Sequence, residues 1–181
     1  MTDVRSSNSA LPGTFEQGSG GEVKGSHPIT QAIRFLKQRK VGFTLRPYKY
    51  QEKGGTEIAS RELGMDENRV IKTLVMEDDR GNAFLVLMHG DREVSTKNLA
   101  RIIGVKTVRP CEPETAHRHT GYLVGGISPF GTRKNLPVYM EETILHLPTI
   151  LINAGKRGLL AEMTPEELVR VLNPAPVHVA I

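Results

Sequence analysis

Apolar residues recur at helical spacing in several short segments of the chain. In residues 28–36, Ile29, Ile33 and Leu36 fall on one helical face. The last such segment begins at Thr164 and has proline and acidic residues in its first turn, which are the residue types that start helices. Apolar spacing, together with caps and glycine stops, predicts helices over residues 28–36, 56–63, 95–103, 113–117 and 164–172, with Thr56 as an N-cap and Gly64 and Gly104 as stops.

Other apolar segments alternate with polar residues or run uninterrupted over the length of a strand. Residues 69–76 and 83–88 flank a turn in which Gly81 or Asn82 can adopt a positive φ, and this predicts a β-hairpin. A further apolar run ends at Val124, just before two glycines. The patterns predict strands over residues 43–50, 69–76, 83–88, 105–108, 136–140 and 148–153, and one that ends at Val124. Strands and short helices interleave without a βαβ rhythm, so we expect an α/β (α+β) domain with a mixed sheet.

Composition limits the fold to one domain. The chain has 181 residues, which is enough for a single core. Residues 1–27 contain five serines and five glycines and few large apolar side chains. We expect them to form a disordered extension outside the fold, and residues 28–181 to form the domain.

Charge and cysteine content narrow the class of partner. The net charge is +4 and the sequence pI is about 9.3, which permits an RNA partner. No apolar run approaches the roughly 20 residues that cross a bilayer, and no secretory signal is recognised, so no membrane partner is expected. Cys111 is the single cysteine, which excludes an internal disulfide and agrees with a reducing cytoplasm.

A glycine-rich stretch stands out at residues 121–131 (GYLVGGISPFG). Glycine tolerates positive φ and lets other groups approach the backbone closely, so such a loop can direct several N–H groups at one point. That arrangement suits an anion or a carbonyl oxygen that gains negative charge. A plain tight turn also favours glycine and proline, so this pattern alone leaves both interpretations open.

Two basic features add candidate chemistry. Lys72 interrupts an otherwise apolar strand, so its side chain either lies at a rim or reaches into a polar pocket. Residues 155–158 (GKRG) lack the spacing of a P-loop, which argues against an NTPase. They form either a basic turn or a holder for a phosphate or a terminal ribose, and Arg133 and Lys134 have the same two interpretations.

Metal and hydrolase signatures are weak. His117 and His119 resemble half of a metal site, but no Cys or acidic partner follows at ligand spacing. The GxSxG elbow of a serine hydrolase is absent, and Ser128 is followed by proline. We therefore expect no metal and no cofactor.

Three motifs in order give a specific resemblance. Residues 70–74 (VIKTL), 120–129 (TGYLVGGISP) and 155–158 (GKRG) resemble those of the YbaK/EbsC family. Its members are free-standing aminoacyl-tRNA deacylases similar to the editing domain inserted in bacterial prolyl-tRNA synthetases. The likeness runs from about Pro28 to Leu172. It implies a single compact domain, a mixed barrel-like β-sheet surrounded by short helices.

The resemblance also assigns roles to residues of this chain. Lys72 matches a pocket lysine that holds the aminoacyl end of the tRNA, and Tyr48 matches an aromatic at the pocket entrance. Gly125, Gly126 and Ser128 match a loop that cradles the ester and the terminal adenosine. The other substrate-binding residues that we expect from these motifs are Thr73, Tyr122, Ile127, Pro129, Asn153, Gly155, Lys156 and Arg157.

This chain departs from the family pattern at two positions. Where the YbaK branch commonly has SGGKRGLD, residues 153–160 read NAGKRGLL. Asn153 thus replaces a serine and Leu160 an aspartate. The departures bear on which amino acid is removed.

The activity implied is trans-editing, with Cys on tRNA(Pro) as the substrate and no cofactor. Partners would be the acceptor end of tRNA(Pro) and, as a candidate, prolyl-tRNA synthetase. An aminoacyl ester is already activated, so positioning and oxyanion stabilisation can supply much of the rate. Alternatives are a deacylase for Ala or another small residue, a non-catalytic module that binds nucleotide, tRNA or a synthetase, and a small-molecule hydrolase.

Overall fold

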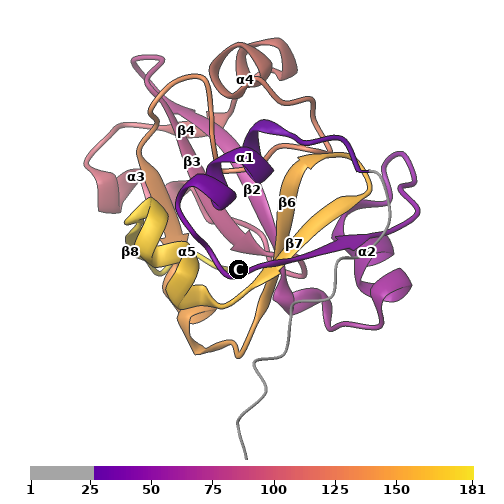
Figure 1. Cartoon of the computed structure of the whole chain (residues 1–181). Helices are drawn as coiled ribbons and strands as arrows, with labels where there is room; N and C mark the ends of the chain where they lie inside the picture. The colour runs from indigo at the N-terminus through magenta and orange to yellow at the C-terminus, as the bar shows by residue number, and fades with distance from the viewer. Residues whose placement is uncertain (1–26) are drawn as a thin grey trace, which may run out of the picture.

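A computed structural model describes residues 27–181, which fold into a mixed α/β domain (Figure 1). The expected N-terminal extension lies, but for its last residue, outside the described residues. The helices are α1 (Gln31–Gln38), α2 (Gly55–Leu63), α3 (Thr96–Ile103), α4 (Pro113–Thr120) and α5 (Pro165–Leu172), with 3-10 turns η1 (Glu67–Arg69) and η2 (Glu142–His146). The strands are β1 (Thr44–Pro47), β2 (Val70–Asp78), β3 (Ala83–His89), β4 (Val108–Pro110), β5 (Val138–Glu141), β6 (Ile150–Lys156), β7 (Leu159–Met163) and β8 (Ala175–Val177).

Helix ends follow local side-chain chemistry. The hydroxyls of Thr30, Ser95 and Thr164 accept hydrogen bonds from main-chain N–H groups in the first turns of α1, α3 and α5. The predicted stops at Gly64 and Gly104 are confirmed. The predicted N-cap at Thr56 is wrong, because α2 begins one residue before it. The Thr56 hydroxyl instead donates to Glu67 Oε1 at 2.6 Å.

The sheet is mixed, as predicted, and contains eight strands. Seven of them follow the order β1-β7-β6-β2-β3-β5-β8, and β4 pairs with β2 beside this path. The β2–β6, β3–β5 and β5–β8 pairs are parallel, and the other pairs are antiparallel. The short helices pack around this sheet (Figure 1).

The two edges of β2 differ. On one side β2 pairs with β3 from Ile71 to Glu77. On the other side β6 pairs with β2 at Val70 and Ile71, and β4 pairs from Met76 to Asp78. Residues 72–75 therefore have a strand neighbour on one side only. We call this interruption the β2 gap.

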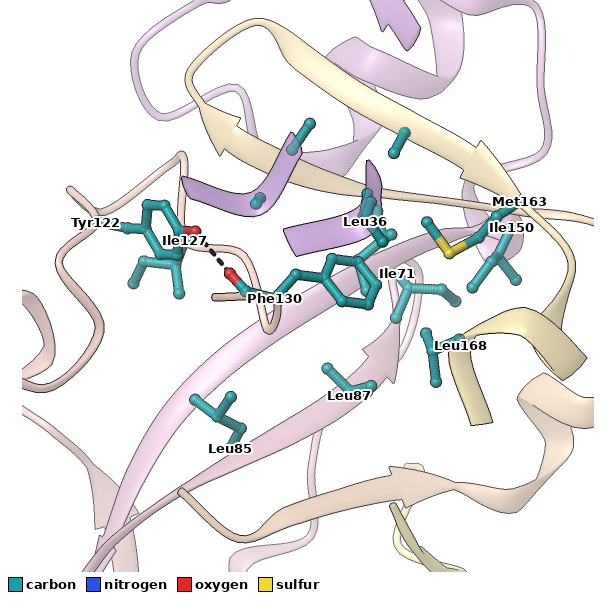
Figure 2. Close-up of a cluster of buried hydrophobic side chains, with 14 of the residues drawn as sticks. Leu36, Ile71, Leu85, Leu87, Tyr122, Ile127, Phe130, Ile150, Met163 and Leu168 are labelled. Atoms are coloured by element: carbon teal, nitrogen blue, oxygen red, sulfur yellow. Dashed lines mark hydrogen bonds between the residues drawn. The ribbon is translucent and has the colours of Figure 1, made fainter. Parts of the chain in front are cut away.

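The main core lies between α1, the sheet and the loop that follows α4. Phe130 is fully buried at its centre, together with Leu36 of α1 and Leu87 of β3. Figure 2 shows the Tyr122 hydroxyl directed at the Phe130 carbonyl, to which it donates a 2.6 Å hydrogen bond. This hydrogen bond and the buried Phe130 side chain anchor the loop to the core.

Two strand predictions fail and two strands were missed. The run that ends at Val124 is a loop, and Leu123 and Val124 are exposed, because that segment has no neighbouring strand. The strand over 105–108 is displaced to β4, beginning at Val108. Strands β7 and β8 were not predicted. Strand β7 is the second arm of a hairpin whose turn lies at residues 157–158, whereas the sequence pattern predicted that the preceding strand ends at residue 153.

Candidate functional site

A cavity of about 550 Å³ opens at the β2 gap. Its floor is β2, and one wall is the β6–β7 hairpin at Asn153 and Leu160. The segment from Tyr48 to α2 forms a second wall, and the end of β4 with the glycine loop forms a third. Of the residues predicted from the sequence, the cavity is lined by Tyr48, Lys72, Thr73, Gly125, Ile127, Asn153 and Arg157.

Lys72 projects from the floor of the cavity and is half-buried. Its ammonium group donates to Arg92 O at 2.5 Å, in the segment that follows β3. The side chain is thus partly covered while its ammonium group makes an exposed hydrogen bond. A single hydrogen bond to a carbonyl leaves two further N–H donors on the ammonium group.

The glycine loop contains a tight turn. The Gly126 N–H donates to Leu123 O at 2.9 Å, and Gly125 has φ +89°, which is the geometry of a type II turn with glycine at its third position. A Cβ on Gly126 would lie 2.9 Å from Arg157 N, so this position also requires glycine for packing. The glycine loop is therefore a tight turn, and Val124 and Gly125 of this turn also line the cavity.

The two adjacent glycines of the turn differ in whether their N–H group is free. The Gly126 N–H is already engaged in the turn, whereas the Gly125 N–H donates to no acceptor within residues 27–181. Gly125 also lines the cavity. Pro129 has no N–H to offer.

Arg157 closes one side of the mouth. Its Nε donates to Val124 O at 2.9 Å, and its guanidinium carbon lies 5.4 Å from the centre of the Tyr50 ring. The side chain thus ties the β6–β7 turn to the glycine loop. Its other N–H groups stay available at an exposed rim.

Asn153 and Leu160, the two departures from the family pattern, are cross-strand partners. They face each other in the β6–β7 register, and both line the cavity. Asn153 Oδ1 is buried without a hydrogen-bond partner within the described part of the chain. This wall consequently carries an amide and an aliphatic group where a hydroxyl and a carboxylate were expected from the resemblance.

Six predicted residues do not line the cavity. Ser128 is fully buried, and its Oγ accepts a 3.3 Å hydrogen bond from Phe130 N, inside the loop. Tyr122 and Pro129 are buried as well, and Gly155 packs against the Tyr122 ring. Gly126 lies beneath the turn, and Lys156 is exposed. These six residues are Gly126, Ser128, Tyr122, Pro129, Gly155 and Lys156.

Sequence reasoning missed several residues of the cavity. Tyr50 lies beside Gly125 in the cavity lining, and a Cβ at Gly125 would be 2.8 Å from its hydroxyl. Thr56 and Ala59 contribute from α2. The sequence offered one signal for Tyr50, its position two residues after Tyr48. In an extended segment, side chains two residues apart point to the same side.

Burial perturbs two titratable groups of the cavity. It raises the pKa of the Tyr48 hydroxyl, and the nearby Tyr50 adds to the effect. Burial, followed by the carboxylate of Glu77, raises the pKa of the Cys111 thiol from 9.0 to about 11. Cys111 is thus protonated at neutral pH and is a poor nucleophile.

The two histidines considered for metal binding differ in their contacts, and the buried Nδ1 of His119 has no hydrogen-bond partner within the described residues. His117 Nδ1 lies 3.1 Å from Tyr122 O at the end of α4. Burial lowers the pKa of His119. Within residues 27–181 there is no group of three or more His, Cys, Asp or Glu side chains placed to hold a metal ion.

Comparisons with known proteins agree on one family. The model of the aminoacyl-tRNA editing domain matches residues 53–171. EbsC of Enterococcus faecalis, named as a candidate Cys-tRNA(Pro)/Cys-tRNA(Cys) deacylase, is 31% identical over 145 residues, which cover 80% of this chain and 88% of EbsC. The proline–tRNA ligase of Moorella thermoacetica is 31% identical over 116 residues, 64% of this chain but 19% of the ligase.

A solved structure shares the fold. It is described as a candidate trans-editing enzyme for prolyl-tRNA synthetase, and it matches with a TM-score of 0.76 and 24% identity. The match covers 83% of this chain and 95% of the other. Among residues 27–181, no helix has the length and apolar character to cross a bilayer.

Proposed function

The chain belongs to the aminoacyl-tRNA editing domain family, and on that premise we propose that it is a trans-editing deacylase that removes Cys mischarged onto tRNA(Pro). The observation that carries the proposal is a cavity at the β2 gap with a lysine on its floor and an unengaged Gly125 N–H in its wall. Such a site offers a cation and a main-chain donor but no paired acid and base.

The dimensions of the cavity suit the end of a charged tRNA. Its volume of about 550 Å³ lies within the range of about 300–1,000 Å³ that is typical of small-molecule sites. The aminoacyl group and terminal adenosine together are a ligand of that size. Single-stranded ends with unstacked bases are what small RNA-binding proteins grip, and Tyr48 and Tyr50 provide aromatic surfaces at the mouth.

Two cations would bind the tRNA end. Lys72 has two ammonium donors left for a phosphate or ribose oxygen, and Arg157 presents its remaining N–H groups at the rim. Loss of either cation weakens the hold on the substrate, and loss of Arg157 also removes a hydrogen bond that holds the glycine loop.

The chemistry follows from an ester that is already activated. In Cys-tRNA the substrate sulfur attacks its own carbonyl carbon, the ester C–O bond breaks, and the thiol proton passes to the departing ribose oxygen. The product is a cyclic thioester. An intramolecular attack of this kind can be worth about 7–11 kcal/mol, so the protein has only to orient the substrate and to stabilise the oxyanion. Cys111 takes no part, because its thiol stays protonated.

For an amino acid without a thiol, water must attack the carbonyl instead. The uncharged wall at Asn153 and Leu160 suits a small, neutral side chain and gives no ion pair to a basic one. A deacylase for Ala is therefore the second candidate for the substrate.

The remaining proposals concern the partners of the protein and its location in the cell. The acceptor end of tRNA(Pro) is the proposed partner, with prolyl-tRNA synthetase as a recruiting protein, since relatives of this chain include proline–tRNA ligases. The cytoplasm is the proposed location, since tRNA charging takes place there. A non-catalytic module of the same fold would bind tRNA without turnover.

Deacylation of Cys-, Ala- and Pro-charged tRNA(Pro) tests the proposal. We expect the wild type to release Cys fastest, and Lys72→Ala to lower kcat/KM by about 10- to 100-fold, because a hydrogen bond to a charged group is lost. Lys97→Ala on α3 is the matched control, since Lys97 is exposed and lies outside this cavity. Release of none of the three amino acids by the wild type would reject the proposal, and saturable binding without release would favour the non-catalytic module.

A further inference from the structure

The direction of the main-chain groups along β2 can be worked out from two hydrogen bonds. The Cys111 N–H donates to Val75 O at 2.9 Å, so Val75 directs its polar main-chain groups away from β3. Successive residues of a strand direct these groups to opposite sides, and every second residue therefore shares a side. Thr73 thus turns its N–H and C=O toward the β2 gap.

The neighbouring strand gives the same result. The Leu85 N–H donates to Pro137 O at 2.8 Å, so Leu85 of β3 faces β5 rather than β2. Leu85 is the register partner of Val75. The two therefore form a pair without mutual hydrogen bonds, and Val75 must face the side opposite β3.

Thr73 has no partner in the gap. The β6 ladder ends at Ile71 and the β4 ladder begins at Met76, and neither the N–H nor the C=O of Thr73 bonds to another group within residues 27–181. The Thr73 hydroxyl is also buried and unpartnered in this range, and Thr73 is only 9% exposed. Buried polar groups without partners are rare and costly, and here an unpartnered hydroxyl and two unpaired main-chain groups belong to one residue that lines the cavity.

An aminoacyl group carries the matching set of polar groups. Like a strand residue, it has an N–H donor and a carbonyl acceptor on one carbon atom. In an antiparallel sheet, two opposed residues exchange both of their main-chain hydrogen bonds. At this strand edge Thr73 alone has both main-chain groups unpaired among residues 72–75, and such an edge is complementary to a single amino acid rather than to a longer peptide.

We infer that the aminoacyl group pairs with Thr73 as an opposed residue of an antiparallel strand would. The α-ammonium donates to Thr73 O, and the Thr73 N–H donates to the ester carbonyl oxygen. This inference rests on the proposed function and assigns an element of substrate recognition within it. Because the Gly126 N–H is engaged by Leu123 O, the Thr73 N–H supplies a second donor beside Gly125 as that oxygen gains charge.

The test uses two stable analogues that differ in one group. In 3′-alanylamino-3′-deoxyadenosine an amide replaces the ester, and the propanoylamino counterpart lacks only the α-amino group. We expect the propanoyl analogue to bind the wild type about 10- to 100-fold more weakly by calorimetry, since a charged hydrogen bond is lost. Equal affinities for the two analogues would overturn the pairing.

A second measurement reports on the protein side. The Thr73 amide proton should move downfield in the NMR spectrum when the alanyl analogue binds, while that of Leu74, which faces β3, should move little. Thr73→Val removes the hydroxyl alone and keeps both main-chain groups, so the pairing predicts that the alanyl analogue binds this variant about as tightly as the wild type. Thr107→Val, at an exposed position outside this cavity, is the matched control and should bind as the wild type does.

The outcomes separate this inference from the proposed function. Turnover of charged tRNA together with an unmoved Thr73 amide rejects the pairing and leaves the deacylase standing. Absence of both turnover and analogue binding rejects the two together. Turnover with a preference for the α-amino group and a shifted Thr73 amide supports both.

Discussion

Two buried polar clusters of this domain differ in whether their hydrogen bonds are satisfied. Around Glu141, which is fully buried, Oε2 accepts from the main-chain N–H groups of Val179 and Ala180 at 2.8 and 2.9 Å. The Thr143 hydroxyl donates to Glu141 Oε1 at 3.3 Å and lies 2.8 Å from the buried His89. At the β2 gap, by contrast, Thr73 Oγ1 and Asn153 Oδ1 are buried without partners among residues 27–181.

The difference separates structure from function. A satisfied buried network stabilises one arrangement of the chain, and the Glu141 cluster fixes the C-terminal segment against η2 and β5. An unsatisfied cluster lowers stability unless a ligand completes it. Substitutions in the first cluster should therefore destabilise the fold, whereas removal of an unpartnered group in the second should not.

The largest expected effect is at Glu141. Glu141→Ala removes the acceptor of one buried and one partly buried N–H group and should lower the free energy of unfolding by about 2–4 kcal/mol in urea titrations. The loss of acceptors is the cause, so the exposed neighbour Glu142, replaced in Glu142→Ala, should cost less than about 0.5 kcal/mol. Similar stabilities of the two variants would contradict a structural role for this cluster.

Cys111 is an intermediate case, because it lines the cavity but has Glu77 as a hydrogen-bond partner. Its Sγ lies 3.7 Å from Glu77 Oε2, and its pKa is raised to about 11. At pH 9 about half of an ordinary thiol is ionised but only about 1% of this one, so alkylation by iodoacetamide should be tens of times slower in the folded protein than in urea. Mass spectrometry of this single cysteine gives the rate.

The raised pKa of Cys111 also makes the stability of the protein depend on pH. The folded state holds the thiol proton more tightly than the unfolded state, so the contribution of Cys111 to stability is complete below about pH 9 and is lost as the pH rises through about 11. Cys111→Ala should flatten the stability curve in this window. Equal alkylation rates in folded and unfolded protein at pH 9 would refute the raised pKa.

The smallest expected effect is on stability at Thr73. Thr73→Val keeps the branched shape and removes a buried hydroxyl that has no partner, so the free energy of unfolding should stay the same or rise by up to about 1 kcal/mol. Thermal unfolding measured beside Thr107→Val detects the change. A loss above 1 kcal/mol would mean that the hydroxyl has a structural partner after all.

Local sequence signals predicted much of this fold. Thr164 with its following proline marked the start of α5, and the turn before Asn82 marked the β2–β3 hairpin, because each signal acts over a few residues. Strand β7 was missed because its partner β6 determines it, and the glycines of the turn between them equally suit a loop. The run before Gly125 is apolar, yet it forms no strand, because no neighbour pairs with it.

The site was predicted in part. Lys72 and Gly125 were found because a charge in an apolar strand and a double glycine are unusual in sequence, and both line the cavity. Tyr50 was missed because only the fold brings it beside Gly125. The lack of a partner for Thr73 depends on where two distant ladders stop, which no pattern in residues 70–78 records.

The β2 gap also bears on self-association. An apolar strand with an open edge is a template on which another chain can add a strand, and residues 70–76 (VIKTLVM) have the composition that favours this. In the folded domain the open edge lies at the bottom of a cavity, where an extended chain has no room to pair over several residues. Before β6 arrives, some 80 positions later in the sequence, only the charge of Lys72 interrupts that edge. The charge of Lys72 thus also disfavours aggregation while β6 has not yet paired with β2.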